Sequence, residues 1–285
     1  MQLNQYNDMM PVLGTEETLL MAQVDEIFIN WATKNGAQQM TMPLLLPIQD
    51  LAKLNVYQNF PHQALVATII NIAEFNKKYN NNNNLTALPT YILAPATLAL
   101  PAAACYAVYL HFSNQSLANT GTIITVLGRC CRHEEHYTSL CRTLSFHMRE
   151  IIAFGTQEFV EQHLLNFSIN IINFTKDLGL PVNKIPATDP FFQKYNSRAL
   201  LQQLYPNKYE FIYNDLAIAS INMHRNFFGE RCKIMLANST EYIYTSCVAF
   251  GLERWLSMLY QHYGSWQRAM NTLSKLANVY PHELS

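Results

Sequence analysis

Length, composition and charge already narrow the class of this chain. With 285 residues, 49% of them hydrophobic and 12% aromatic, it has enough apolar material for a packed core, which excludes global disorder and fits one large α+β domain or about two smaller units. Lysine and arginine number 19 against 20 aspartates and glutamates, which gives a net charge of −1. This charge argues against a protein that binds a long nucleic acid, because neutralisation of phosphates by basic side chains supplies much of the affinity for nucleic acid.

The N-terminus and the apolar segments predict a cytoplasmic protein. The opening MQLNQYNDMMPVLG lacks a basic segment followed by an apolar run, so we expect no secretory signal. The longest apolar candidate, 93–110, is interrupted by Pro95 and Pro101, so we expect no membrane span. The six cysteines are scattered, as is typical of buried side chains, metal ligands or nucleophiles rather than disulfides.

Hydrophobic spacing in the first part of the chain predicts helices around one strand. A helix is expected over 16–34, where Asn35-Gly36 ends it. A strand over 38–46 then runs into Pro47, and helical periodicity returns over 49–75. The five asparagines at 80–84 predict a solvated loop.

The remainder of the chain mixes strands with long helices. The predicted strands are 90–94, 122–127, 142–153, 211–222 and 233–236, and the predicted helices are 156–178 and 249–262. Residues 180–207, rich in Pro, Asp and Asn, predict an inserted loop-and-helix excursion. The absence of a regular βαβ order favours an α+β fold. With only 9 glycines and no glycine-rich phosphate loop, any ATP would be held by side chains.

The densest group of charged residues lies in two stretches, 128–136 and 142–150. A hairpin between them would bring together Arg132, Glu134, Arg142, Phe146, Arg149 and Glu150. In the second stretch, Arg142, Phe146 and Glu150 are an even number of residues apart, so a strand would turn them to one side. Guanidinium groups clamp phosphate, a phenyl ring stacks on a purine and a carboxylate accepts from an exocyclic amine, which together suit a nucleotide. A surface ladder of ion pairs is the alternative.

A second feature lies at 245–254, where an apolar strand passes into a helix. Arg254 stands at the helix start in otherwise hydrophobic surroundings. A phosphate-binding arginine and a helix-start charge paired with its neighbour Glu253 are the two interpretations.

Together these features resemble a known family. Arg132-His-Glu134 followed by Arg142, Phe146 and Glu150 resembles motif 2 of the class II aminoacyl-tRNA synthetases, Phe250-Gly-Leu-Glu-Arg254 resembles motif 3, and 16–47 looks like motif 1. Within that superfamily the chain is most similar to the seryl-tRNA-synthetase-like amino acid:[carrier protein] ligases, through segments 100–109, 146–150, 217–224, 227–229 and 245–251. The resemblance implies a class II synthetase catalytic fold, an antiparallel sheet flanked by helices, as a single catalytic domain over 1–285. It also implies a homodimer through motif 1 and no tRNA-binding arm.

The resemblance implies a zinc ion held by Cys105, Glu150 and Cys247, with the amino group of the substrate completing the shell. Three protein ligands and one open position are the arrangement of a functional zinc site. The other cysteines, Cys130, Cys131, Cys141 and Cys232, are expected to be buried small side chains.

The resemblance also assigns roles toward ATP. Arg132 would contact the α-phosphate and the substrate carboxylate, Glu134 the adenine amine, and Phe146 would stack on the ring. Arg142 would bind the γ-phosphate, and Arg254 the γ-phosphate or the other face of adenine. Arg132 and Arg254 are therefore the expected catalytic residues.

The amino acid and the acceptor follow from the same resemblance. Lys208, Glu210 and Asn222 would line the amino-acid pocket, and Mg²⁺ would bridge the phosphates. The reaction implied is ATP-dependent activation of a small amino acid, with glycine or alanine favoured. The aminoacyl group then passes to the phosphopantetheine thiol of a small carrier protein, docked at 180–207.

Three departures and two alternatives remain. Cys131 stands where motif 2 has an aromatic residue, the loop between Glu134 and Phe146 is one residue longer than expected, and Asp215-Leu216 replaces an expected Pro-Thr. They bear on substrate identity more than on activation. The alternatives are a truncated seryl-type tRNA synthetase paralogue, disfavoured by the −1 charge, and a catalytically silent regulatory paralogue.

Overall fold

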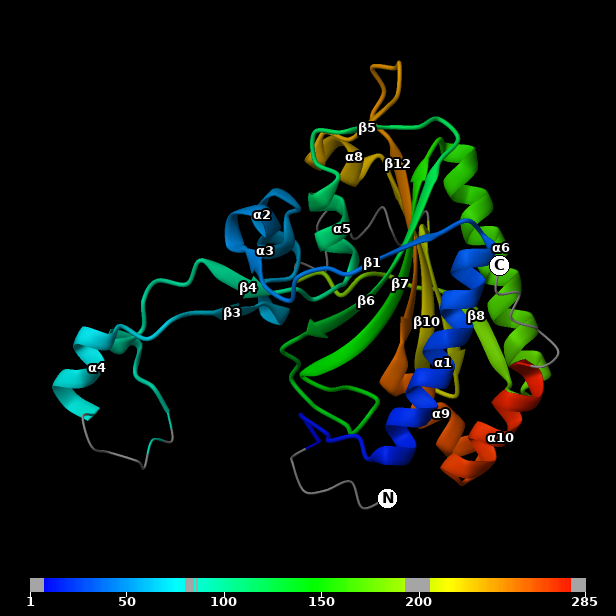
Figure 1. Cartoon of the computed structure of the whole chain (residues 1–285), viewed down its shortest axis with the longest axis horizontal. Helices are drawn as coiled ribbons and strands as arrows, with labels where there is room; N and C mark the ends of the chain where they lie inside the picture. Colours follow the sequence, from blue (N-terminus) through cyan, green and yellow to red (C-terminus); the bar gives the residue numbers. More distant parts are fainter. Residues whose placement is uncertain (1–7, 80–84, 86, 193–205, 278–285) are drawn as a thin grey trace.

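The computed structural model describes residues 8–79, 85, 87–192 and 206–277. Its centre is a seven-stranded sheet with the order β1-β6-β7-β12-β10-β9-β8 (Figure 1). In that order the strands are Gln38–Met40, Thr122–Cys131, Ser145–Gly155, Tyr244–Gly251, Leu216–Arg225, Lys208–Tyr213 and Val182–Pro186. Neighbours are antiparallel, except that β1 runs parallel to β6. The expectation of an α+β fold with an antiparallel sheet flanked by helices is confirmed, with the β1–β6 pair as the parallel exception.

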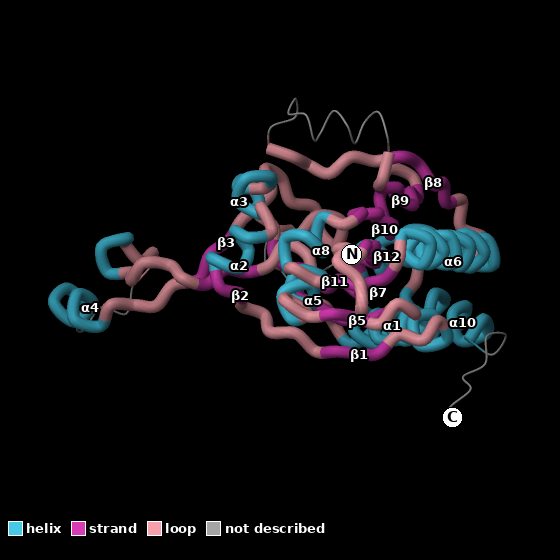
Figure 2. Tube along the Cα trace, turned by 90° about the horizontal axis from the view of Figure 1, so that it is seen from above, coloured by secondary structure: helices cyan, strands magenta, loops and turns pink. Residues whose placement is uncertain are grey.

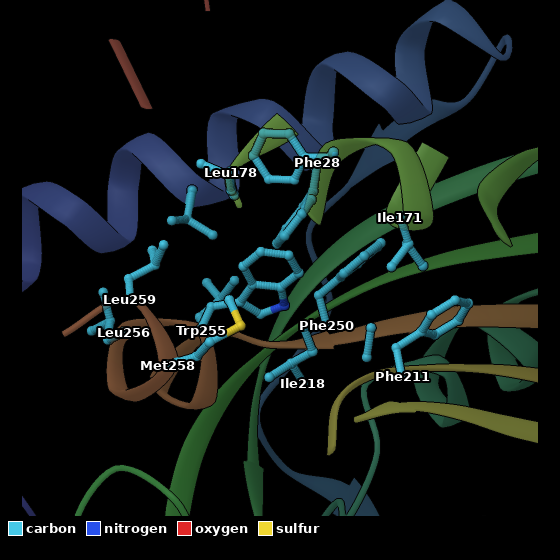
Figure 3. Packing of buried hydrophobic residues seen from close by; sticks show 14 of the residues in the cluster. Phe28, Ile171, Leu178, Phe211, Ile218, Phe250, Trp255, Leu256, Met258 and Leu259 are labelled. Carbon is cyan, nitrogen blue, oxygen red and sulfur yellow. The ribbon is translucent and has the colours of Figure 1, made fainter. Parts of the chain in front are cut away.

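Four helices cover one face of this sheet, which we call the covered face (Figures 1 and 2). They are α1 (Thr15–Lys34), α6 (Gln157–Asp177), α9 (Leu252–Tyr263) and α10 (Trp266–Ala277). The rings of Phe28 and Phe250 stack at 3.9 Å, and Trp255 meets Phe28 edge-on (Figure 3). This contact fixes α1 and the start of α9 against the middle of the sheet. None of the described helices is long and apolar enough to cross a membrane.

Short helices lie over part of the opposite face, which we call the open face. They are α2 (Ile48–Lys53), α3 (Val56–Asn59), the 3₁₀ turn η1 (Pro61–Gln63), α5 (Cys105–His111) and α8 (Phe227–Cys232). A two-stranded sheet of β5 (Ser116–Leu117) and β11 (Met235–Leu236) lies beside them. A second apolar core, separate from that of the covered face, fills the space beneath α5 and α8.

A third sheet carries a projecting arm. It consists of β2 (Leu46–Pro47), β4 (Leu98–Leu100) and β3 (Leu65–Ala67), and the arm adds α4 (Ile72–Tyr79) and the 3₁₀ turn η2 (Thr90–Ile92). The prediction of a strand over 38–46 is wrong in part, because the chain leaves the main sheet after Met40 and re-enters a different one at Leu46.

Other element predictions are also corrected. The helical periodicity over 49–75 breaks into short pieces, because Asn55 takes a left-handed φ of 59° and Pro61 begins a new turn. The stretch 90–94 forms η2 rather than a strand, and 211–222 is two strands joined at Asn214. Helices α5 and α10 were not predicted. The asparagine loop at 80–84 and residues 193–205 of the predicted excursion lie outside the described residues; the excursion begins as strand β8.

Candidate active site

A cavity of about 490 Å³ opens on the open face. Strands β7, β12 and β10 form its floor, and the segments around Phe60 and Phe191, whose rings stack at 5.4 Å, form part of its wall. The cavity is lined by almost every predicted site residue: Cys105, Arg132, Glu134, Arg142, Phe146, Glu150, Lys208, Glu210, Asn222, Cys247 and Arg254.

Three buried side chains form a compact cluster inside this cavity. The ligand atoms of Cys105, Glu150 and Cys247 lie within 4.8 Å of one another. The Cys247 thiol donates to Glu150 Oε2 at 2.8 Å, and the backbone N–H of Ala104 donates to Glu150 Oε1 at 2.8 Å. Ala104, directly before α5, packs against Gly128 of β6 so closely that a Cβ at Gly128 would lie 2.5 Å from the Ala104 Cβ. Glycine is therefore required on β6 for Cys105 to reach its two partners.

The three side chains of this cluster include no positive charge. A hydrogen bond with Cys247 lowers the pKa of Cys105, but burial and the Glu150 charge outweigh it and raise that pKa to about 11. Burial also raises the pKa of Cys247 well above its ordinary value. Both thiols are neutral at pH 7, and the cluster contains no positive group to balance Glu150. Two sulfurs and a carboxylate facing an open cavity fit a divalent metal with one free position, and bound metal would convert the thiols to thiolates.

Arg132 and Phe146 form the face predicted for a nucleotide. The Arg132 guanidinium lies 5.0 Å from the centre of the Phe146 ring, and its Nε donates to the Ala102 carbonyl at 2.9 Å. Arg142 Nη1 lies 3.9 Å from Glu134 Oε2 at the mouth of the cavity. Arg142 comes before β7 begins, so its place in the cavity is set by the loop and not by strand alternation.

Arg254 is held by backbone oxygens rather than by its neighbour. Its Nε donates to the Cys141 carbonyl at 2.9 Å and its Nη1 to the Ala217 carbonyl at 3.0 Å. Glu253 instead accepts from the backbone N–H of His147 and lies 2.7 Å from His147 Nδ1. The interpretation in which Glu253 pairs with Arg254 is therefore wrong. Burial lowers the pKa of Arg254, but an arginine this basic stays charged and available to an anion.

The residues predicted for the amino-acid pocket lie on adjacent strands. Lys208 Nζ is 3.2 Å from Glu210 Oε1 and 3.1 Å from Asp189 Oδ1. Asn222 donates to Ser220 Oγ at 3.2 Å. Asp189 was missed in the sequence, where one aspartate in a polar loop gives no signal.

Arg149 is the one hairpin residue that the structure removes from this group. It points to the covered face, where Nε and Nη2 donate to the two carboxylate oxygens of Asp25 at 2.7 Å each. The prediction that it joins Glu150 is wrong, because successive residues of a strand face opposite sides. Cys130, Cys131 and Cys232 are buried as expected, whereas Cys141 is half-buried and lines the cavity.

Comparison with known proteins agrees with this geometry. No protein-family model matches the chain. "Amino acid--[acyl-carrier-protein] ligase 1" of Bradyrhizobium diazoefficiens is 29% identical over 241 residues, 81% of this chain and 73% of the relative. "Amino acid--[acyl-carrier-protein] ligase 2" of the same organism is 32% identical over 202 residues, 67% of this chain and 60% of the relative. This chain is a homologue of the amino acid–[acyl-carrier-protein] ligases. The recognition drawn from the motifs, and with it the expectation of a ligase, is confirmed.

Solved structures give the fold of this ligase homologue. It superimposes on M. kandleri SerRS, crystallised with A. aeolicus tRNASec, with a TM-score of 0.82 at 15% identity, over 100% of this chain and 61% of the other. A cytoplasmic serine-tRNA ligase from Naegleria fowleri and a prolyl-tRNA synthetase from Giardia lamblia match at TM-scores of 0.70 and 0.66, with 11% and 15% identity. They cover 93% and 90% of this chain, and 54% and 49% of those chains. The predicted class II synthetase fold is confirmed.

Proposed function

We propose that this chain activates a small amino acid with ATP and passes the aminoacyl group to the phosphopantetheine thiol of a carrier protein. The observation that carries the proposal is one cavity holding both the Cys105–Glu150–Cys247 cluster and the Arg132–Phe146 face. The homologous ligases of B. diazoefficiens support the carrier protein as acceptor.

The cluster would hold one zinc ion that selects the substrate. Zinc bound there supplies a Lewis-acidic open position that takes a free α-amine. Cys105 and Cys247 provide thiolates and Glu150 a carboxylate, with Ala104 N–H orienting that carboxylate from outside. We propose glycine or alanine as the substrate, since a large side chain would crowd the ion. Lys208, Glu210 and Asn222 line the same cavity and would bound the amino-acid pocket.

The arginines would bind and align ATP. Arg132 would neutralise the α-phosphate and position the substrate carboxylate, and Phe146 would stack on adenine while Glu134 accepts from its amine. Arg142 and Arg254 would bind the γ-phosphate, the latter already fixed by two backbone carbonyls. The substrate carboxylate attacks the α-phosphorus, and pyrophosphate, with its Mg²⁺, leaves. The carrier thiolate then attacks the aminoacyl carbonyl and releases AMP. Positioning and charge neutralisation supply most of the catalysis in such steps.

The proposed partners and setting follow the same family resemblance. We propose a homodimer formed through motif 1, residues 16–47, acting in the cytoplasm as one catalytic domain over 1–285. The excursion at 180–207 would receive the acidic carrier. The first of its described portions ends at Phe192, whose backbone N–H donates to the Asn59 carbonyl at 2.8 Å at the cavity wall.

Pyrophosphate exchange with each amino acid, followed by thioester formation on a holo-carrier, tests this proposal. We expect exchange with glycine or alanine and a thioester that forms on the holo-carrier but not on the apo-carrier. Charging of bulk tRNA would instead establish the truncated synthetase. Purified protein that binds neither ATP nor zinc would establish the silent paralogue.

A further inference from the structure

Tyr109 is a fully buried tyrosine to which the proposed activation and transfer steps give no role. It lies on α5 one helical turn after Cys105, a spacing that turns both side chains to the same side of the helix. Its ring stacks at 3.9 Å on Phe228 of α8, the helix beside α5 in both views (Figures 1 and 2), and meets Phe154 at 5.7 Å. This packing on two sides fixes the place of the Tyr109 hydroxyl.

The Tyr109 hydroxyl contacts two polar side chains. It shares a hydrogen bond with the Cys105 side chain, and its oxygen lies 3.3 Å from His224 Nδ1. The same nitrogen lies 3.3 Å from Thr245 Oγ1. His224 lines the cavity, so the hydroxyl connects a predicted metal ligand to a cavity side chain.

His224 lies at an irregularity in the sheet. The pairing of β10 with β12 shifts register between Met223 and Arg225, so His224 is the extra residue of a β-bulge. Bulges re-aim a side chain and are frequent next to active sites. In this sheet the bulge coincides with the contact between His224 and Tyr109.

The number of protons available decides which of these groups donate. A tyrosine hydroxyl carries one proton and can also accept, whereas a thiolate can only accept. When Cys105 binds a metal its sulfur is a thiolate, and a charged acceptor takes the hydroxyl proton in preference to a neutral one. The Tyr109 oxygen is then the acceptor toward His224, so we place the proton of His224 on Nδ1. In this order each group has a partner.

The three ligand side chains are not supported equally. Glu150 and Cys247 lie on β7 and β12, two paired strands in the middle of the sheet, and Glu150 also accepts from the Ala104 N–H. Cys105 is instead the first residue of α5, a helix of only seven residues. A ligand in that position gains most from a partner that holds its side chain, and such partners orient ligands in metal sites generally. Tyr109 is placed to hold Cys105.

We propose that Tyr109 positions the metal site by donating a hydrogen bond to the Cys105 sulfur, with His224 holding the Tyr109 hydroxyl from the other side. The inference rests on the proposed function, because it takes Cys105, Glu150 and Cys247 as the metal ligands. It deepens that function by adding two positioning residues outside the ligand set.

Zinc affinity and a cobalt spectrum of the full chain test the inference. Tyr109→Phe removes the hydroxyl and keeps the buried ring. We expect its zinc dissociation constant, measured by competition with a chromophoric chelator, to rise about 10–100-fold, the usual effect of removing an outer partner of a metal ligand. In protein loaded with Co²⁺, the sulfur-to-cobalt absorption band should shift, because the Cys105 thiolate loses its hydrogen bond.

The matched control is Tyr57→Phe. Tyr57 packs against the same core as Tyr109, and its buried hydroxyl has no hydrogen-bond partner among the described residues. Its zinc dissociation constant should stay within about threefold of the wild type, and its cobalt band should not move. His224→Phe should weaken zinc binding less than Tyr109→Phe does. The double variant of Tyr109→Phe with His224→Phe should be no weaker than Tyr109→Phe alone, because His224 acts through Tyr109.

The other outcomes separate the proposals. A Tyr109→Phe variant with the zinc affinity and cobalt band of the wild type overturns the positioning role. Weaker zinc binding with an unmoved cobalt band also overturns it, because the hydroxyl would then act on the fold and not on the Cys105 sulfur. Wild-type protein that binds neither metal overturns the metal assignment and this inference together. If zinc affinity and the cobalt band respond to Tyr109→Phe in a protein without pyrophosphate exchange, the proposed function is wrong and the role of Tyr109 stands.

Discussion

Two adjacent residues of β7, Arg149 and Glu150, are both buried and face opposite sides of the same sheet. On the covered face, Arg149 meets the carboxylate of Asp25 through two hydrogen bonds of 2.7 Å. On the open face, Glu150 meets two neutral thiols and one backbone N–H. Within the part of the chain that the structure describes, Arg149 forms an ion pair with Asp25, whereas Glu150 forms none.

That difference separates a structural charge from a functional one. A buried charge without a partner costs several kcal/mol, and such sites persist where a ligand or metal supplies the missing charge. The covered face should therefore determine stability, and the open face should determine metal binding and catalysis. Four predictions test this division of roles between the two faces.

Removing the open-face charge should have the largest effect. Glu150→Gln keeps the shape but removes the carboxylate ligand, so we expect pyrophosphate exchange to fall by at least about 1000-fold, roughly 4 kcal/mol of transition-state free energy. Cys105→Ala and Cys247→Ala should do the same with the fold intact. Cys130→Ala, a buried cysteine that does not line the cavity, is the matched control. Full exchange in Glu150→Gln or in either ligand-cysteine variant would refute the metal assignment.

Breaking the covered-face pair should change stability instead. Asp25→Asn leaves Arg149 charged in the core and should lower the free energy of unfolding by about 3–5 kcal/mol, as for other broken buried pairs. Urea unfolding measures it. The double variant Asp25→Leu with Arg149→Met should recover much of the loss, since no charge is then left unpaired. An Asp25→Asn variant as stable as the wild type would mean that the Asp25–Arg149 pair does not stabilise the fold.

A buried histidine gives the covered face a dependence on pH. Burial lowers the pKa of His163 to about 3, and its Nδ1 lies 2.9 Å from Ser246 Oγ. Below about pH 6.5 the unfolded chain gains a proton that the folded chain does not, so stability falls as the pH drops from 6.5 toward 3. The loss at pH 5 should be about 2 kcal/mol, at 1.36 kcal/mol per pKa unit. His163→Gln should flatten this slope in unfolding measured from pH 7 to 5; an unchanged slope would assign it to other groups.

The smallest change in stability and activity is expected at Thr125, which forms hydrogen bonds with both Arg149 and Glu150. Its hydroxyl donates to the Glu150 carbonyl at 3.1 Å and accepts from Arg149 Nη1 at 3.4 Å. Thr125→Val should cost about 1 kcal/mol of stability, the usual net value of a hydrogen bond. Pyrophosphate exchange should stay within about threefold of the wild type, since the Glu150 carboxylate is untouched; a large loss of exchange would show that the two faces are coupled.

Parts of this arrangement could be predicted from the sequence. Amphipathic spacing found α1 and α6, and the flanking charges found the β6–β7 hairpin, because these signals are local. The same alternation rule that grouped Phe146 with Glu150 places Arg149 on the other side, so that error was avoidable. The metal ligands are 45 and 97 residues apart along the chain, and only family resemblance could bring them together.

Other features left no readable signal. The apolar residues of the arm contribute to the helical periodicity over 49–75, although several of them face solvent. The spacing of hydrophobic residues does not show what each side chain packs against. His163 sits in an ordinary amphipathic helix, and nothing in the sequence marks it as buried against Ser246. Asp189 lines the cavity just after β8, where its carboxylate lies 3.1 Å from Lys208 Nζ of β9, a contact between strands that the sequence does not show.

The metal content of the purified chain tests the central claim most directly. Elemental analysis of the wild type, Cys247→Ser and Cys130→Ala, each expressed and purified alike, would measure zinc per chain. The account predicts about one zinc in the wild type and in Cys130→Ala and almost none in Cys247→Ser, with all three folded. Wild-type protein that binds no zinc at saturating metal, or a Cys247→Ser variant that retains it, would contradict the account.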